Sequence, residues 1–313
     1  MKINTDKNVK RRDFLRSAGA AALFAAVPAL NARETASKHS KLDRLACNSW
    51  PFRGYFDTPE MHHYRNPKYP LLTQPEFPQF LADHFHIHHV EFLPQHFVNT
   101  DPSTIDKVKA GLKKAHSTCC NLMGVEVPGG VYRRGADRQA AAKKAAERWV
   151  GVAVALGSPS ITVPLTGPGP VDPDVAAHNL EPLVGVAHAR GIKVLFHNDS
   201  MKRESAETLT SVIKQLGPNR TGTCPDFGNF AVKSAAFALS QLRMLAPYAH
   251  NICHSKDGIG EGGKFYPDNF PASMKVMHEA GFHGLYSLEY DESVGAPING
   301  VRKLMHLTEK YLD

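Results

Sequence analysis

Cysteine is scarce in this sequence, with only five in 313 residues and no CxxC pair among them. Two are adjacent, Cys119 and Cys120, and neighbouring cysteines rarely bridge each other, so no disulfide scaffold is expected. Cys224 and Cys253 fall in predicted interior strands, where a small buried thiol is the usual role. The chain also lacks a glycine-rich phosphate loop and any low-complexity linker that would mark a second domain.

Long runs of positive charge are also absent from most of the chain. The formal net charge is +7, but residues 1–32 hold six Lys/Arg and two Asp, so +3 remains on the rest. No block of five or six basic residues follows residue 32. A polyanion partner usually requires such a block or patch, so we expect no nucleic-acid partner.

The N-terminus has the order of an export signal. A basic segment, Lys10–Arg16, precedes the alanine-rich run Ser17–Leu30, and Ala29-Leu30-Asn31-Ala32 has the small-x-small form of a cleavage site. The run is too short to span a bilayer comfortably, so no stable membrane span is expected. Arg11-Arg12 followed closely by Phe-Leu resembles the twin-arginine (Tat) export signal, which implies that residues 1–32 are a Tat-type signal peptide and that the protein is periplasmic or secreted.

From Leu42 onward, short β-branched or aromatic runs alternate with amphipathic stretches. The predicted strands are Arg44–Trp50, His88–Leu93, Asn121–Val127, Ser160–Leu165, Lys193–His197, Gly222–Asp226, Asn251–His254 and Gly284–Glu289. The predicted helices are Gln74–Phe85, Thr104–Ser117, Asp137–Leu156, Asp174–Arg190, Ser205–Leu216, Lys233–Pro247, Phe270–Ala280 and Asn299–Leu312. Four helices are followed by a glycine that can take positive φ: Gly157, Gly191, Gly217 and Gly281. Eight such units predict a parallel (β/α)8 TIM barrel, one α/β domain over residues 42–313.

Polar residues end four successive late strands. In barrels of this kind the active site lies at the carboxyl ends of the strands, so we expect these side chains to meet at the barrel mouth. One inward residue from each strand gives His197, Asp226, His254 and Glu289. Two imidazoles and two carboxylates suit a first-row divalent metal, and four unpaired ionisable groups in a barrel mouth would otherwise be costly. The sequence therefore predicts a metal site made of these four residues.

Three short motifs carry a family resemblance. "DFGN" at 226–229, "HSKD" at 254–257 and "SLE" at 287–289, each at the end of a late strand, resemble the xylose isomerase-like TIM-barrel superfamily, which includes sugar phosphate isomerases and epimerases. The resemblance implies a Glu-Asp-His-Glu quartet that binds Mn, Zn, Co or Mg, with the two glutamates as acid–base groups. Glu91, in "HHVEF", resembles the family's strand-2 "VE" pattern. We expect the following residues to face the substrate: Trp50, Glu91, Asn198, Asp199 and Asn229.

The fifth strand departs from that pattern, since His197 stands where the family has glutamate. Epimerisation needs correctly placed bases beside a carbonyl, so the loss of one glutamate bears directly on the reaction. We expect an exported, metal-dependent isomerase or epimerase acting on a sugar or keto sugar, with Glu289 moving the proton and Lys256 steadying oxyanion charge. A lyase acting on a 3-keto-glycoside, which needs one base plus the metal, is the alternative. Asp199 could also supply a second carboxylate.

Two other classes of function are open to the sequence. A barrel that binds carbohydrate without turnover would also explain His197, because that substitution removes one of the two bases. An abasic-site nuclease fits poorly, since such activity in this superfamily uses a larger histidine-rich cluster. The partner predicted here is a small-molecule carbohydrate, and the oligomeric state is left open.

Overall fold

Eight parallel strands form the inner ring of the protein in this computed structural model, which describes residues 41–166, 168–198, 205–229, 234–256, 258–259, 265–266, 269–291 and 295–312. The strands are β1 (Leu45–Asn48), β2 (His89–Phe92), β3 (Thr118–Leu122), β4 (Ser160–Val163), β5 (Lys193–His197), β6 (Thr221–Cys224), β7 (Ile252–Ser255) and β10 (Leu285–Leu288). Their order is β6-β5-β4-β3-β2-β1-β10-β7, and neighbouring strands in this order pair in parallel. Parallel bridges from Thr223 to Ala249 and from Asp226 to His254 bring β6 and β7 together. The ring is therefore a nearly closed barrel.

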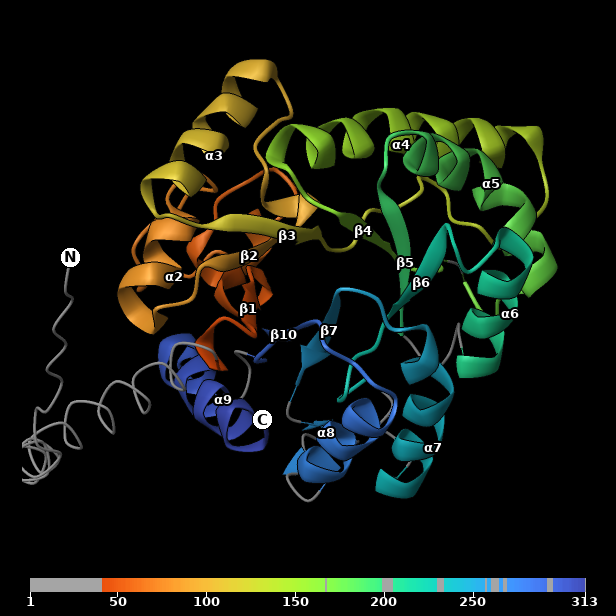
Figure 1. Ribbon diagram of the computed structural model, residues 1–313. Coiled ribbons are helices and arrows are strands. Elements are labelled where there is room, and N and C mark those ends of the chain that lie inside the picture. The colour runs from red at the N-terminus through yellow and green to blue at the C-terminus, as the bar shows by residue number, and fades with distance from the viewer. Residues whose placement is uncertain are drawn as a thin grey trace, which may run out of the picture. The chain divides into compact units, whose positions relative to one another are not determined.

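Eight α-helices of the described chain alternate with these strands and surround the barrel (Figure 1). They are α2 (Phe77–Phe85), α3 (Pro102–Lys114), α4 (Ala136–Leu156), α5 (Pro173–Ala189), α6 (Ala206–Leu216), α7 (Ala235–Leu245), α8 (Phe270–Glu279) and α9 (Pro297–Tyr311). Short 3₁₀ helices η1 (Trp50–Tyr55), η2 (His62–Tyr64), η3 (Pro94–His96) and η4 (Ala246–Tyr248) lie in the loops, and β8 (Gly258–Ile259) pairs antiparallel with β9 (Phe265–Tyr266). The predicted (β/α)8 fold is confirmed.

The helix ends follow local chemistry. Asp172, Ser205 and Ser234 each accept hydrogen bonds from backbone N–H groups in the first turn of α5, α6 and α7. Such caps satisfy donors that have no partner within the helix. The four predicted glycines all have positive φ: Gly157, Gly191, Gly217 and Gly281. Most predicted boundaries consequently agree with the structure to within a few residues.

The third strand is an exception. The predicted strand Asn121–Val127 is wrong at both ends, because β3 runs from Thr118 to Leu122. Cys119 and Cys120 are buried and belong to this strand. The strand ends at Leu122, two residues before Gly124, whose φ is +80°. Residues 124–127 form a loop instead, and this loop becomes part of the candidate site.

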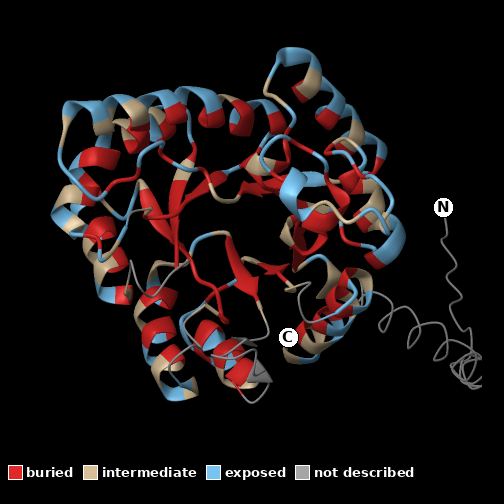
Figure 2. Ribbon diagram, turned by 180° about the vertical axis from the view of Figure 1, so that it is seen from behind, coloured by how far each residue is buried: buried red, intermediate tan, exposed pale blue. Residues whose placement is uncertain are grey.

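The core is built in layers. Inside the barrel, side chains from alternate strands pack together, and Ala46, Cys120, Leu195 and Ile252 form one such layer with Cys224 beside it. A second, larger core lies between the strands and the helices. Figure 2 shows this division, with buried strands at the centre and exposed helix faces outside. The barrel interior is therefore filled by side chains.

Two of the predicted features fall on residues that the structure does not describe. The predicted signal peptide, residues 1–32, lies outside the described residues, and so does Asp199. None of the described helices has both the length and the apolar character that crossing a membrane requires. All five cysteines are buried and free.

Candidate functional site

Four ionisable side chains meet at the carboxyl ends of the late strands. His197 is the last residue of β5, Asp226 lies two residues beyond β6, His254 is within β7, and Glu289 follows β10 directly. Each is at most 3% exposed. The structure thus brings together the four residues that the strand ends predicted.

The donor atoms of these side chains converge on one point. His254 Nδ1 lies 3.0 Å from His197 Nε2 and 3.3 Å from Glu289 Oε2. Asp226 Oδ2 lies 3.6 Å from His197 Nε2 and 3.7 Å from His254 Nδ1. Ligands of a four-coordinate ion with bonds of about 2.1 Å are about 3.4 Å apart in a tetrahedron. The spacing of His197, Asp226 and His254 therefore suits a metal ion, and Glu289 lies beside this group, next to His254.

Asp226 offers an additional test of this fit. Its Oδ1 accepts hydrogen bonds from the backbone N–H groups of Gly228 and Asn229, at 2.7 and 2.9 Å. Its Oδ2 is buried, and no residue of the described chain donates a hydrogen bond to it. A buried carboxylate oxygen normally has such a partner, so an atom left over in this position is what a metal ligand requires. Burial raises the pKa of Asp226, but Lys256, His197 and His254 outweigh it and lower the pKa well below its usual range.

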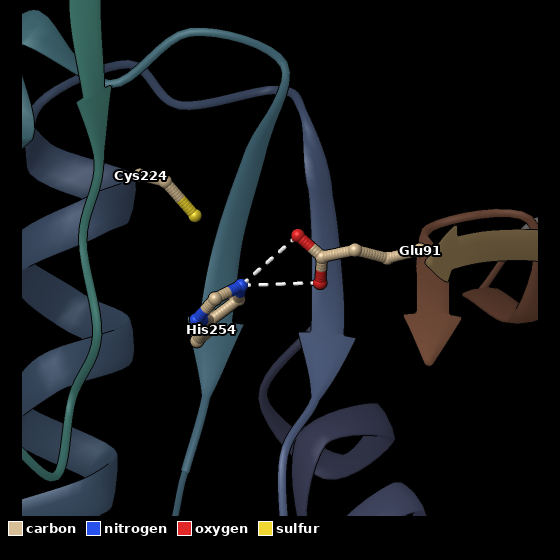
Figure 3. A group of neighbouring side chains, drawn as sticks. All are labelled: Glu91, Cys224 and His254. Carbon is tan, nitrogen blue, oxygen red and sulfur yellow. Dashed lines mark hydrogen bonds and ion pairs between the residues drawn. The ribbon is translucent and has the colours of Figure 1, made fainter. Parts of the chain in front are cut away.

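His254 is oriented from behind by a buried carboxylate. Glu91, on β2, lies with both carboxylate oxygens 3.1 Å from His254 Nε2 (Figure 3). Asn121 and Ser287 donate to the same carboxylate at 2.6 and 2.7 Å. A histidine that donates one ring N–H to a carboxylate presents its other nitrogen, here Nδ1, to a metal. Glu91 is 0% exposed, so the structure places it behind the ligands and not at a substrate-facing wall.

The pKa values of Glu91 and His254 are both shifted from their ordinary values. Burial raises the pKa of Glu91, but His254 and the hydrogen bonds from Asn121 and Ser287 lower it below its ordinary value. Burial lowers the pKa of His254, yet its ionisable neighbours Cys224, Glu91 and Glu289 raise it well above the ordinary value. Metal binding to Nδ1 competes with protonation of this imidazole, so binding is expected to depend on pH.

Glu91, Cys224 and His254 form a second group of potential ligands (Figure 3). Burial raises the pKa of the Cys224 thiol to about 11, so it is protonated near neutral pH. A metal there would have to ionise the thiol, whereas Asp226 Oδ2 has no hydrogen-bond donor among the described residues. The group of His197, Asp226 and His254 therefore fits an ion better.

Lys256 and Asn48 hold the carboxylate of Glu289. Lys256 Nζ donates to Glu289 Oε1 at 2.7 Å and to Asn229 Oδ1 at 2.9 Å, and it lies 3.8 Å from Asp226 Oδ2. Asn48 Nδ2 donates to Glu289 Oε2 at 2.8 Å. Asn48 ends the first strand and is not among the residues predicted from the sequence. Its only sequence signal is its position at a strand end.

Asn198 has a different place from the one expected for a substrate ligand. Its side-chain Nδ2 donates to the carbonyl of Asp226 at 2.9 Å, and its Oδ1 accepts from the N–H of Asp226 at 2.7 Å. Both ends of the amide thus bind the backbone of one residue. Asn198 fixes the end of β6 to the end of β5, which sets the position of Asp226 beside His197.

A cavity of about 330 Å³ opens beside these residues, lined in part by His197, Lys256 and Glu289. Trp50 forms part of its wall, as do the less polar residues Leu93, Met123 and Pro164. Gln95, Glu126 and Thr162 add polar groups, and the sequence analysis singled out none of these. Polar groups in a wall that includes an aromatic ring are typical of a small-molecule site.

Arg53 supports Trp50. Its guanidinium carbon lies 4.6 Å from the centre of the Trp50 ring, and Nη2 lies 3.1 Å from Asp291 Oδ1. The pair with Asp291 ties the loop after β1 to the end of β10. Trp50 is held at the cavity by this contact and by its edge-on packing against Tyr64, 5.7 Å away.

Replacing Glu91 with glutamine is expected to weaken metal binding by about 10- to 100-fold, the usual effect of losing an outer partner of a histidine ligand. The amide cannot accept hydrogen bonds on both sides, so His254 loses its fixed orientation. Isothermal titration with Mn²⁺ or Zn²⁺ checks this. The milder Ser287→Ala variant should show a smaller effect in the same direction, and the exposed Glu60→Gln should show none. Unchanged affinity in the folded Glu91→Gln protein would mean that Glu91 does not orient a ligand.

Comparison with known proteins gives a consistent result. The family profile described as "Xylose isomerase-like TIM barrel" matches residues 82–311. Comparison with curated protein sequences finds no match. Among solved structures, the chain is similar to a xylose isomerase-like TIM barrel protein from Mycobacterium smegmatis in complex with magnesium, at 14% identity and a TM-score of 0.60, over 86% of this chain and 98% of that one.

Two further structures show the same similarity of fold. The IOLI protein with a bound zinc atom has 13% identity and a TM-score of 0.64, over 86% of this chain and 99% of that one. D-Psicose 3-epimerase from Clostridium cellulolyticum H10, solved with D-tagatose, has 13% identity and a TM-score of 0.59, over 86% and 97%. At such identities the likeness establishes the fold, and the chemistry has to be argued from the site.

Proposed function

The chain belongs to the xylose isomerase-like TIM barrel family, and from this premise we propose that it is a metal-dependent isomerase or epimerase that moves a proton next to the carbonyl of a sugar or keto sugar. One observation carries the proposal. The ligand atoms of His197, Asp226 and His254 lie 3.0–3.7 Å from one another, with Glu289 Oε2 3.3 Å from His254 Nδ1, beside a cavity that also reaches Lys256.

His197, Asp226, His254 and Glu289 would hold the metal. A bound divalent ion acts as a Lewis acid that polarises a carbonyl and its neighbouring hydroxyl. Mn, Zn, Co and Mg are the candidates, and two imidazole ligands favour Zn or Co over Mg, which prefers oxygen. Similar structures that contain magnesium or zinc support a divalent metal in a barrel of this fold.

The chain's own residues supply the proton transfer and the orientation. Glu289 is the base beside the substrate carbon, and its carboxylate is aimed by Asn48 and Lys256. Lys256, with its ammonium group at the cavity, stabilises negative charge as it develops on the carbonyl oxygen. Trp50 offers a flat apolar face in the cavity wall, against which the C–H face of a sugar ring can pack.

Isotope exchange tests the proposal. D-Tagatose, D-fructose and a 3-keto-glucoside are incubated with the metal-loaded protein in deuterated water, and products are followed by NMR. We expect deuterium at the carbon next to the carbonyl, together with an epimer or isomer, and loss of both after chelation. Tight metal binding without exchange into any of these sugars would instead indicate a barrel that binds carbohydrate without turnover. Release of the aglycone from the 3-keto-glucoside alone would indicate a lyase.

We also propose that the protein is exported by the Tat route, on the basis of Arg11-Arg12 and the apolar run that follows. Changing both arginines to lysine is expected to leave the precursor in the cytoplasm, because the paired arginines are what the translocase reads. Cell fractionation and blotting in a Tat-competent host measure this, with Lys10→Arg as the matched control. Equal export of the double-lysine variant contradicts the proposal.

A further inference from the structure

The cavity contains a second carboxylate, that of Glu126, in addition to Glu289. We propose that Glu126 is the second acid–base group of this site and replaces the glutamate that β5 lacks. The inference rests on the proposed function, and it names the residue that completes a two-base reaction. His197 occupies the position where the family resemblance predicts a glutamate, so the second base has to come from another element.

The loop after β3 places Glu126, an exposed residue, at the cavity. Val125 and Val127, its neighbours on either side, are buried. The N–H groups of Gly124 and Val125 both bond the carbonyl of Thr162, at 3.1 and 2.8 Å. With its two neighbours anchored in the core, Glu126 lies on the opposite side of the extended chain, at the cavity.

A side-chain contact fixes the same loop from the other flank. Gln95, which also lines the cavity, donates from Nε2 to the carbonyl of Gly124 at 3.4 Å. Gly130 bonds the carbonyl of Val127 at 2.9 Å, which closes the turn beyond Glu126. A group that must give or take a proton at one atom needs this kind of rigid support.

The two carboxylates come from distant parts of the ring. Glu289 follows β10, and Glu126 follows β3, with β1 and β2 between these strands in the barrel order. A substrate in the cavity is thus approached by Glu289 from the metal side and by Glu126 from the side of β3. Two bases on different sides of one carbon invert its configuration, whereas a single base returns the proton to the face from which it came.

The proposed step balances without any oxidant or further reactant. Glu289 takes the proton from the carbon next to the carbonyl, and the C–H electron pair moves into the carbonyl group. Protonated Glu126 then gives its proton to the opposite face of the same carbon, and the electron pair returns to form the new C–H bond. Exchange of protons with water restores both carboxyl groups to their starting states.

The test compares Glu126→Gln with wild type and with Glu147→Gln, an exposed glutamate on α4. D-Tagatose and D-fructose are the probes, in deuterated water with the metal-loaded protein. We expect Glu126→Gln to lose epimerisation by about 10²- to 10⁴-fold, the usual contribution of one acid–base group. It should keep its metal content, and Glu289 should still exchange deuterium into the original sugar with retention of configuration.

Three results would each contradict the role of Glu126, and only the last would also contradict the proposed function. Epimerisation by Glu126→Gln at the wild-type rate, with Glu289→Gln inactive, overturns the role of Glu126 and leaves the proposed function standing. Loss of exchange as well as epimerisation, with metal content unchanged, also overturns it, since Glu289 should act alone on its own face. Absence of exchange by wild type on both sugars and on the 3-keto-glucoside overturns the proposed function and this inference with it.

Discussion

Replacing Asp226 with asparagine is expected to lower divalent-metal affinity by more than the roughly 10- to 100-fold that loss of an outer partner costs. Asp226 Oδ2 is the buried oxygen to which no described residue donates a hydrogen bond, so its charge is directed at the site and nowhere else. The amide keeps the size of the side chain and can still accept from Gly228 and Asn229. Metal content after dialysis and titration with Mn²⁺ or Zn²⁺ measure the effect.

Asp106→Asn serves as the matched control, because Asp106 is an exposed residue on α3 with only a 3.7 Å contact to Lys109. That variant should bind metal like wild type. If Asp226→Asn folds and binds metal as tightly as the control, the ligand set described here is wrong.

The second large effect concerns Glu289. Its change to glutamine is expected to lower the rate of proton exchange by about 10²- to 10⁴-fold, because the amide cannot take a proton from carbon. Lys256 would also lose the carboxylate that it contacts at 2.7 Å. Measurement of kcat at saturating metal separates this loss from weaker metal binding, since Glu289 is also a proposed ligand.

The exposed Glu279→Gln on α8 is the control for Glu289→Gln. We expect its kcat to be that of wild type. A Glu289→Gln protein that exchanges protons at the wild-type rate would assign the base to another residue, and Glu126 would be the next to examine.

His197 changes the charge of the proposed site relative to the family pattern. Asp226 and Glu289 would be the anionic ligands among the four, and their two negative charges would equal the positive charge of a divalent ion. A third carboxylate would add one negative charge and weaken the pull on a carbonyl oxygen. A histidine ligand would therefore preserve the Lewis acidity of a bound ion, and under the proposed function another residue would carry out the proton transfer of the missing glutamate.

Much of the fold could be predicted from the sequence because it depends on local signals. Glycines that take positive φ end the helices, and apolar runs of strand length alternate with amphipathic stretches. The third strand was misplaced because Cys119 and Cys120 gave a weak strand signal, whereas Val125 and Val127 suggested a strand beyond Gly124. Those valines are buried as expected, but they anchor a loop.

The ligand residues could be predicted for a topological reason. Parallel strands in a barrel all end at one face, so His197, Asp226, His254 and Glu289 had to lie near one another. Glu91 could not be placed in the same way. Whether an inward side chain reaches the cavity or lies beneath the ligands depends on the register between strands, and β2 pairs with β3 through an irregularity between Val90 and Glu91.

Asn48 and Glu126 were missed for related reasons. Asn48 acts through a partner 241 residues away, and nothing near it in the sequence indicates that contact. Glu126 lies in a stretch that was predicted to be strand, so its side chain was not considered as part of a loop at the mouth. Long-range pairing and loop direction both come from tertiary structure.

The most direct test of the metal centre is an anomalous difference map from crystals soaked in Mn²⁺ or Zn²⁺. We predict one strong peak about 2.0–2.2 Å from His254 Nδ1 and Asp226 Oδ2, with His197 Nε2 and Glu289 Oε2 completing the shell. A peak between Cys224, Glu91 and His254 Nε2, or none within reach of Asp226, would contradict the account.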